Sequence, residues 1–177
     1  MKPGLYPDLS EADYFADPAL SVSGAKLILK APALFRHRQE HPVASAAFDH
    51  GHAAHQLVLG AGAPIAVVEA DNWMTKAAKE QRSAAREAGS IPLLSKDYQR
   101  VRDMADALGS HSLAATLLTG GLAEASAFAI DEGTGVPTRA RFDYLRDDLI
   151  VDYKSAADSE PAAFARAAGA YGYHQQH

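Results

Sequence analysis

Hydrophobic and polar positions follow a helical pattern through most of the first two thirds of the chain. Apolar residues recur every three to four positions, as on one face of an amphipathic helix. Ser21 or Ser23 can cap the first of these helices, and Pro32 can open the second. Ser95 is placed to cap the last of them. Because these helices follow one another along the chain, residues 20–118 are expected to form a mainly helical N-terminal part. The predicted helices cover residues 20–30, 32–40, 44–59, 75–89 and 96–110.

A strand-like pattern follows this helical part. Residues 122–130 alternate between apolar and other side chains and end at the turn-forming sequence DEGTG. The sequences VPTRARFDYL and LIVDYK follow as two further predicted strands. Ser159, Glu160 and Pro161 can then start a final helix. We expect a three-stranded meander and a closing helix over residues 122–170.

This order of elements is typical of an α+β fold. The length suits a single domain over residues 1–177, because it is enough to enclose one hydrophobic core. The first twenty residues are rich in Pro, Asp and Tyr and are expected to be an extended lead-in. Residues 63–70 are expected to form a short additional strand.

Composition narrows the classes of function. The net charge of -5 argues against a generally basic nucleic-acid-binding surface, but the segment from Lys26 to Arg38 contains four basic and no acidic residues. Cysteine is absent, which excludes disulfides, thiol nucleophiles and thiolate metal sites. No apolar run approaches the roughly 20 residues that span a bilayer, and the first residues lack the hydrophobic region of a signal peptide. We therefore expect a cytoplasmic location and no membrane partner.

Charged residues occur inside the predicted strands, where sheet propensity disfavours them. Asp152 and Lys154 share one face of their strand, and antiparallel pairing can bring Asp143 close to Asp152. Neighbouring carboxylates repel each other, and a hard divalent cation such as Mg²⁺, or Mn²⁺ in its place, relieves the repulsion. A single Asp-x-Lys sequence most often lies on the exposed polar face of a strand, where the two charges pair. Its combination with Asp143 and the upstream Glu124 favours the metal site of a hydrolase.

Together these motifs resemble the signature of the PD-(D/E)xK nuclease superfamily. The chain is most similar to the RecB-like and RecE-like branch, which includes phage proteins of the exonuclease VIII type, and Gly51 to His55 match the G-x-x-x-H helix of that branch. The resemblance implies a restriction-endonuclease-like core and metal-dependent exonuclease action on linear double-stranded DNA in phage or bacterial recombination. It implies that Lys154 is catalytic and that Glu124 supports a second metal or its water shell. The metal ligands that it implies are His55, Asp143, Asp152 and the backbone carbonyl of Tyr153.

DNA contacts are expected near these residues. The two serines at the start of the first helix stand where free N–H groups favour an anion, although capping alone also explains them. The two arginines that precede Asp143 share its strand face and either contact phosphates or pair with nearby acids. Lys26 and Arg36 can join the two serines, because the chain resembles lambda-type exonucleases, which use Ser and Arg in such a pocket. The candidate DNA contacts are Ser21, Ser23, Lys26, Arg36, Arg139, Arg141 and Gln176.

The polar helix at residues 75–89 is a candidate flap beside the DNA. Its basic side chains fall within about one third of the helix circumference and would give sequence-independent affinity. An exposed helix with local ion pairs, such as Lys76 with Glu80, is the alternative interpretation. The four basic residues of this arc are Lys76, Lys79, Arg82 and Arg86.

The end of the chain departs from the family pattern. Tyr173 to Gln176 supply the glutamine of a family Q-x-x-x-Y motif, but its tyrosine and the next core strand do not follow, so we expect a C-terminally truncated domain. The resemblance also implies a homo-oligomer and a single-strand annealing partner at double-stranded DNA ends. One alternative is a DNA-binding or assembly module without catalysis. Another is a Cas4-like nuclease, which the absence of cysteine ligands for an iron–sulfur cluster disfavours.

Overall fold

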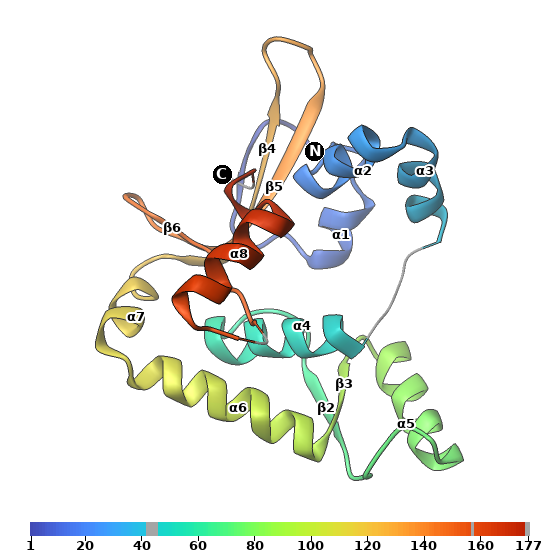
Figure 1. Ribbon diagram of the computed structural model, residues 1–177. Coiled ribbons are helices and arrows are strands. Elements are labelled where there is room, and N and C mark those ends of the chain that lie inside the picture. Colours follow the sequence, from blue (N-terminus) through green and yellow to red (C-terminus); the bar gives the residue numbers. More distant parts are fainter. Residues whose placement is uncertain (42–45, 157, 176–177) are drawn as a thin grey trace.

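The computed structural model describes the backbone of residues 1–41, 46–156 and 158–175 (Figure 1). The described part is a mixed α+β fold with two sheets. The larger sheet has four strands in the order β1-β4-β5-β6, and the smaller sheet pairs β2 with β3 in parallel. In Figure 1 the long hairpin of β4 and β5 extends away from the helices α4 and α6. The α+β class expected from the sequence is confirmed.

Strands β4 (Leu122–Ile130), β5 (Pro137–Leu145) and β6 (Ile150–Val151) form the predicted antiparallel meander. The turn between β4 and β5 is closed by Asp131. Its side chain accepts hydrogen bonds from the backbone N–H of Thr134 at 2.8 Å and from the hydroxyl of Thr134 at 2.6 Å. Gly135 adopts a φ of 71°, a conformation that glycine reaches without steric conflict.

Strand β6 is shorter than the sequence pattern predicts. It ends at Val151, so Asp152, Tyr153 and Lys154 follow the strand instead of lying within it. The backbone N–H of Tyr153 is bound by the side chain of Asp143 at 2.7 Å. A side-chain carboxylate thus takes the place of the backbone carbonyl that would have continued the ladder.

The first twenty residues contain structure that the sequence pattern did not predict. Strand β1 (Gly4–Tyr6) pairs antiparallel with β4 and adds a fourth strand to the expected three. Helix α1 (Glu11–Ala16) follows, and its N-terminus is capped by Ser10, whose hydroxyl accepts the N–H of Asp13 at 3.0 Å. Both elements are too short for a periodic pattern, and their stability comes from docking onto β4 and β5.

Three helices begin where the sequence predicts. Helix α2 (Val22–Lys30) is capped by Ser21, which accepts the N–H of Gly24 at 3.2 Å. Helix α3 (Pro32–Glu40) starts at its proline, and α8 (Pro161–Tyr171) is capped by Glu160 through the N–H of Ala163 at 2.9 Å. Among the residues that the structure describes, none of the helices has the length and apolar content needed to cross a membrane.

The start of α6 (Ser95–Ser110) corrects the expected cap. The helix begins at Ser95 itself, and Leu94 occupies the cap position without a side-chain hydrogen bond. The hydroxyl of Ser95 donates instead to the carbonyl of Val68 at 3.4 Å. A short helix, α7 (Ser112–Leu117), follows α6 and was also not predicted, because its six residues are fewer than two helical turns.

A core cluster joins α4 (Ala46–Leu59) to α6 and β3 (Ile91–Leu94). Ala53 and Ala54 of α4 are fully buried against Ile91, Leu93 and Val101. Strand β3 was not predicted, because the sequence IPLL is buried throughout and shows no alternation. This packing fixes α4, and with it the side chains that α4 directs at the large sheet. The remaining elements are β2 (Ile65–Val68), α5 (Lys76–Glu87) and the 3₁₀ turn η1 (Tyr173–Gln175).

Gly121, immediately before β4, is expected to tolerate no side chain. A Cβ atom there would lie 2.5 Å from the carbonyl oxygen of Leu145 and 2.6 Å from the ring of Tyr144. Gly121→Ala should therefore destabilise the fold by about 1–3 kcal/mol, the range for overpacking. Gly109→Ala is the matched control: nothing lies within 4 Å of its Cβ, and alanine should add about 0.5–1 kcal/mol to that helix. Urea denaturation of both variants measures the difference, and equal midpoints would contradict the assignment.

Candidate metal centre and its surroundings

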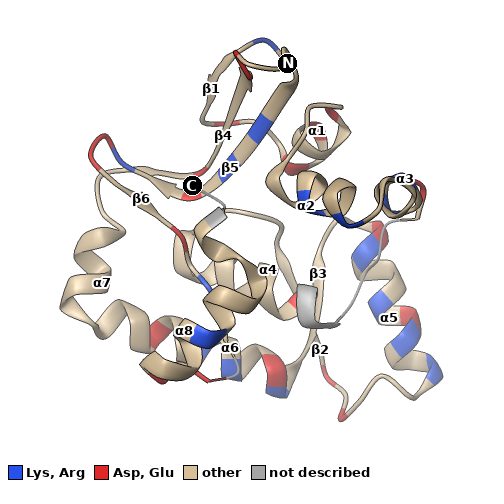
Figure 2. Ribbon diagram, turned by 45° about the horizontal axis from the view of Figure 1, so that its top comes forward, with Lys and Arg blue, Asp and Glu red and all other residues tan. Residues whose placement is uncertain are grey.

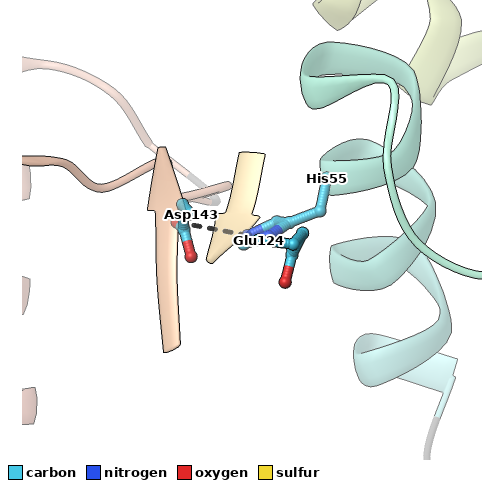
Figure 3. A group of neighbouring side chains, drawn as sticks. All are labelled: His55, Glu124 and Asp143. Atoms are coloured by element: carbon cyan, nitrogen blue, oxygen red, sulfur yellow. Dashed lines mark hydrogen bonds and ion pairs between the residues drawn. The ribbon is translucent and has the colours of Figure 1, made fainter. Parts of the chain in front are cut away.

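Three side chains from three separate elements converge between α4 and the large sheet (Figure 3). His55 comes from α4, Glu124 from β4 and Asp143 from β5, and each offers a ligand atom within 4.8 Å of the other two. Nδ1 of His55 is 3.3 Å from Oε1 of Glu124, and Nε2 is 3.7 Å from Oδ2 of Asp143. His55 thus lies between the two carboxylates.

The strand register places Glu124 and Asp143 at opposite positions on neighbouring strands. Ala123 pairs with Tyr144 and Ala125 with Phe142, which places Glu124 across from Asp143. The pairing is interrupted at this position, and Glu124 has a φ of 54°. That conformation is strained for a residue other than glycine, and such strain is common at functional sites.

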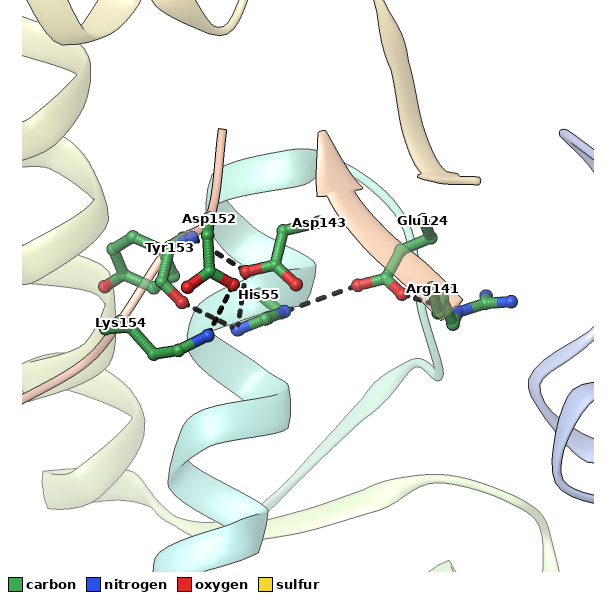
Figure 4. Close-up of polar contacts among 7 residues, drawn as sticks. All are labelled: His55, Glu124, Arg141, Asp143, Asp152, Tyr153 and Lys154. Atoms are coloured by element: carbon green, nitrogen blue, oxygen red, sulfur yellow. Dashed lines mark hydrogen bonds and ion pairs between the residues drawn. The ribbon is translucent and has the colours of Figure 1, made fainter. Parts of the chain in front are cut away.

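The segment after β6 adds three groups to the cluster (Figure 4). The backbone N–H of Tyr153 donates to Oδ2 of Asp143 at 2.7 Å, and its carbonyl oxygen lies 3.2 Å from Nε2 of His55. Nζ of Lys154 donates to Oδ1 of Asp152 at 2.5 Å. The structure therefore brings together His55, Asp143 and the Tyr153 carbonyl, three of the four ligands that the family resemblance implies. Asp152 lies beside them, bound to Lys154. The role of all four groups as metal ligands stays a prediction.

The carboxyl of Asp143 is held in an unfavourable environment for its charge. Burial is the main cause that raises its pKa to about 6, and the charge of Asp152 adds to the effect. The positive charges of His55 and Lys154 and the N–H of Tyr153 act in the opposite direction. A buried carboxylate whose pKa is raised in this way gains stability when a cation binds to it.

The pKa values of the other two residues are governed by their hydrogen bonds. Burial alone would raise the pKa of Glu124, but hydrogen bonds from His55 and Arg141 outweigh it and lower the pKa. Burial alone would lower the pKa of His55, but the hydrogen bond to Glu124 and the charge of Asp143 raise it. Both shifts follow from one chain of contacts that runs from Arg141 through Glu124 to His55.

The donor set fits a divalent cation. Carboxylate and carbonyl oxygens are the ligands that Mg²⁺ and Mn²⁺ prefer, and an imidazole nitrogen suits Mn²⁺ in a mixed site. Binding a cation would also offset the repulsion and desolvation that raise the pKa of Asp143. His55, Glu124 and Asp143 thus form a candidate centre for a divalent metal ion.

The two arginines of β5 are bound within the protein. Arg141 donates from Nε to Oε2 of Glu124 at 2.7 Å, which is the pairing alternative that the sequence left open. It also donates from Nη1 to the hydroxyl of Ser126 at 2.8 Å and to the carbonyl of Leu9 at 3.0 Å. Arg139 donates to the carbonyls of Tyr14 and Asp17. These bonds fasten the N-terminal segment to the sheet.

Several candidate DNA contacts share one cavity with the metal centre. This cavity has a volume of about 310 Å³ and is lined by His55, Glu124 and Asp143 on one side. Helix α1 adds the aromatic rings of Tyr14 and Phe15, which sequence analysis did not single out. The candidate DNA contacts in the lining are Ser21, Ser23, Arg139 and Arg141.

The remaining candidates lie elsewhere. The ammonium of Lys26 is bound to carbonyls at the end of α8, and Arg36 is exposed on α3. Gln176 lies outside the described residues. Figure 2 shows Lys and Arg recurring along α5, where Arg86 pairs with Asp49 at 2.8 Å and Lys76 approaches Glu80 at 3.8 Å. These DNA contacts stay predictions.

The fold and this cluster define a PD-(D/E)xK nuclease-like domain: acids on adjacent strands, an Asp-x-Lys after the next strand, and a histidine from a preceding helix. A family model described as "PDDEXK-like domain of unknown function (DUF3799)" matches residues 21–177, and the chain belongs to this family. The superfamily that the sequence resembles is thereby confirmed. A search of curated proteins gave no match.

The strained conformation of Glu124 gives a prediction that is independent of activity. Glu124→Gly should be more stable than Glu124→Ala by about 1–2 kcal/mol, because glycine adopts a positive φ without steric conflict. Both variants lack the carboxylate, so the comparison isolates the backbone. Ala123→Gly is the control. Ala123 does not have a positive φ, so glycine at this position should be less stable than the wild-type alanine. Thermal unfolding in EDTA measures the stabilities of the two Glu124 variants. A higher stability of Glu124→Ala would show that the backbone at this position is not strained.

Proposed function

We propose that this protein is a Mg²⁺-dependent, RecE-like exonuclease that hydrolyses phosphodiester bonds at the ends of linear double-stranded DNA, with Mn²⁺ able to replace Mg²⁺. The observation that supports it most strongly is the convergence of His55, Glu124 and Asp143 within 4.8 Å. The Asp152–Lys154 pair stands directly beside this cluster. Family membership supports the nuclease class, and the similarity of the motifs to RecE-like proteins supports the subtype.

Each of these residues would have a separate role in the reaction. His55, Asp143, Asp152 and the Tyr153 carbonyl would hold the cation, and Glu124 would support a second one or its water shell. A bound divalent cation supplies positive charge at the reacting phosphate and makes a nearby water easier to deprotonate. Lys154 would orient the attacking water or neutralise charge that develops as the bond from phosphorus to the leaving sugar oxygen breaks.

The path of the DNA would start in the cavity that contains the metal centre. Ser21 and Ser23 stand at the start of α2, where N–H groups and the helix dipole favour a terminal phosphate, and Arg36 lies on the following helix, α3. Arg139 and Arg141 line the same cavity. Helix α5 would add affinity that depends on salt and not on sequence.

Digestion of matched linear and covalently closed circular duplexes tests this proposal. We expect Mg²⁺-dependent loss of the linear DNA only, no digestion in EDTA, and slower digestion when the 5′ end carries a hydroxyl in place of a phosphate. Digestion of the circle would contradict exonuclease action. Binding of linear DNA without cleavage under Mg²⁺ or Mn²⁺ would favour the non-catalytic DNA-binding module.

The proposal includes a homo-oligomer and a single-strand annealing partner, both supported by the similarity to RecE-like recombination proteins. It also includes the cytoplasmic location expected from the sequence. Light scattering at several protein concentrations tests the homo-oligomer. A single species with the mass of one chain at every concentration would remove the homo-oligomer from the proposal.

A further inference from the structure

The C-terminal end of α8 lies against the lysine of the proposed active site. The ring centroid of Tyr173, the first residue of η1, is 5.6 Å from Nζ of Lys154. An ammonium within about 6 Å of an aromatic face is attracted to the electrons of the ring. Lys154 therefore has two contacts for its charge, the carboxylate of Asp152 at 2.5 Å and the ring of Tyr173.

Lys26 fixes the helix end that carries this ring. Its ammonium donates to the carbonyls of Tyr171 at 3.1 Å and Gly172 at 2.8 Å, where α8 ends. The last carbonyls of a helix lack partners within the helix and attract cations. Gly172, with a φ of 63°, then reverses the chain direction, and Tyr173 follows immediately. Lys26 thus holds the turn from which Tyr173 reaches Lys154.

Tyr173 packs against two other aromatic side chains. Tyr173 packs against Phe164 of α8 with ring centroids 6.1 Å apart. Tyr171 stacks on Tyr173 with ring centroids 5.8 Å apart and is 68% exposed, and Tyr173 is the one of the two whose ring contacts Lys154. Tyr173 therefore offers a test position, and Tyr171, on the other side of Gly172, offers a control that lacks the contact with Lys154.

We propose that Tyr173 is a positioning residue for Lys154 and that Lys26 latches the helix end that carries Tyr173. This inference rests on the nuclease function proposed above. When Asp152 shares its charge with a bound cation, its attraction for the ammonium of Lys154 weakens. The ring of Tyr173 then keeps the ammonium in place, and Lys26 keeps the ring in place.

Steady-state kinetics of three tyrosine variants test the role of the ring. Tyr173→Leu should lower kcat about tenfold, the scale expected when a reacting group is misplaced, with KM changed less than about twofold. Tyr173→Phe, which keeps the ring, should stay within about twofold of wild type, as should Tyr171→Leu. An unchanged kcat in Tyr173→Leu, or an equal loss in Tyr173→Phe, would overturn the proposal.

The variant Lys26→Met separates a latch from a DNA contact. A latch predicts a lower kcat with little change in KM, and a smaller further loss when Lys26→Met is combined with Tyr173→Leu, because both changes disturb one unit. A phosphate contact predicts a higher KM for DNA and an unchanged kcat. The second result would overturn the latch.

Chemical labelling of Lys154 tests the contact without any need for cleavage. An amine-reactive reagent, read out by peptide mass spectrometry, should modify Lys154 several-fold faster in Tyr173→Leu than in wild type or Tyr171→Leu. Equal labelling rates would overturn the positioning role even in an active enzyme. If the wild type cleaves no DNA but labelling follows this order, the proposed function fails and the contact between Tyr173 and Lys154 stands.

Discussion

Lys154→Met is expected to lower the rate of DNA cleavage by about 10³-fold, within the range for loss of one general acid–base or charge-stabilising group. Methionine retains the apolar stem of lysine but has neither its charge nor its protons. In the structure this ammonium is 2.5 Å from Asp152 and next to the candidate metal centre. Initial rates on linear duplex DNA with Mg²⁺ measure the loss, and circular dichroism shows whether the fold is retained.

Two further variants sharpen this prediction. Lys96→Met alters an exposed lysine of α6, which contributes no side chain to the candidate metal centre, and its rate should stay within about twofold of wild type, as for most surface substitutions. Lys154→Arg keeps the charge but cannot release a proton at ordinary pH. Partial activity of Lys154→Arg would assign the lysine to charge stabilisation, and activity as low as that of Lys154→Met would assign it to proton transfer. A wild-type rate in Lys154→Met would contradict its catalytic role.

Asp143→Asn is expected to make the metal-free protein more stable and to abolish its stabilisation by Mn²⁺. Burial raises the pKa of Asp143 from 3.8 to about 6, so the ionised form destabilises the folded state. Asparagine carries no charge and retains an oxygen that can accept the N–H of Tyr153. At pH 8 in EDTA the gain should be about 1–3 kcal/mol, since each pKa unit corresponds to roughly 1.4 kcal/mol.

The sign of this effect fixes its pH dependence. A raised folded-state pKa means that the contribution of Asp143 to stability is greatest below pH 3.8 and is lost as the pH rises through about 6. Asp143→Asn and wild type should therefore have similar melting temperatures near pH 4 and diverge above pH 6. Asp147→Asn, an exposed aspartate near β5, is the control and should match wild type throughout. A variant less stable than wild type at pH 8 would contradict the assignment.

Mn²⁺ should reverse the order of these two proteins. A ligand that binds only the folded state at about 1,000 times its dissociation constant adds about 4.1 kcal/mol, which exceeds the expected deficit, and wild type should gain this while Asp143→Asn gains little. The carboxylate of Asp143 would then lower the stability of the metal-free protein and bind the ion in the Mn²⁺-bound protein. Equal Mn²⁺-dependent shifts in both proteins would place the ion elsewhere.

Local patterns predicted much of the fold, because they depend on neighbouring residues. The cap at Ser21, the proline at the start of α3 and the Asp131–Thr134 turn each act within four residues. Strand β1 and strand β3 could not be found in this way. The first is three residues long and is stabilised by pairing with β4, and the second is a buried run without alternation.

The candidate site was predictable in its residue types but not in its contacts. The charged positions in the strands and the G-x-x-x-H motif identified His55, Glu124 and Asp143. The bonds of Arg139 to Tyr14 and Asp17 cross more than 120 residues of sequence. Such contacts leave no local pattern, because they depend on how separate elements pack.

Pulsed electron paramagnetic resonance of Mn²⁺ can show whether His55 and the two carboxylates hold a divalent cation. Imidazole coordination places a ¹⁴N nucleus next to the metal, which modulates the electron spin echo. Wild-type protein with Mn²⁺ should show this modulation, and His55→Ala should lose it. Mn²⁺ bound to wild type without a nitrogen signal, or with one that persists in His55→Ala, would show that His55 does not bind the ion.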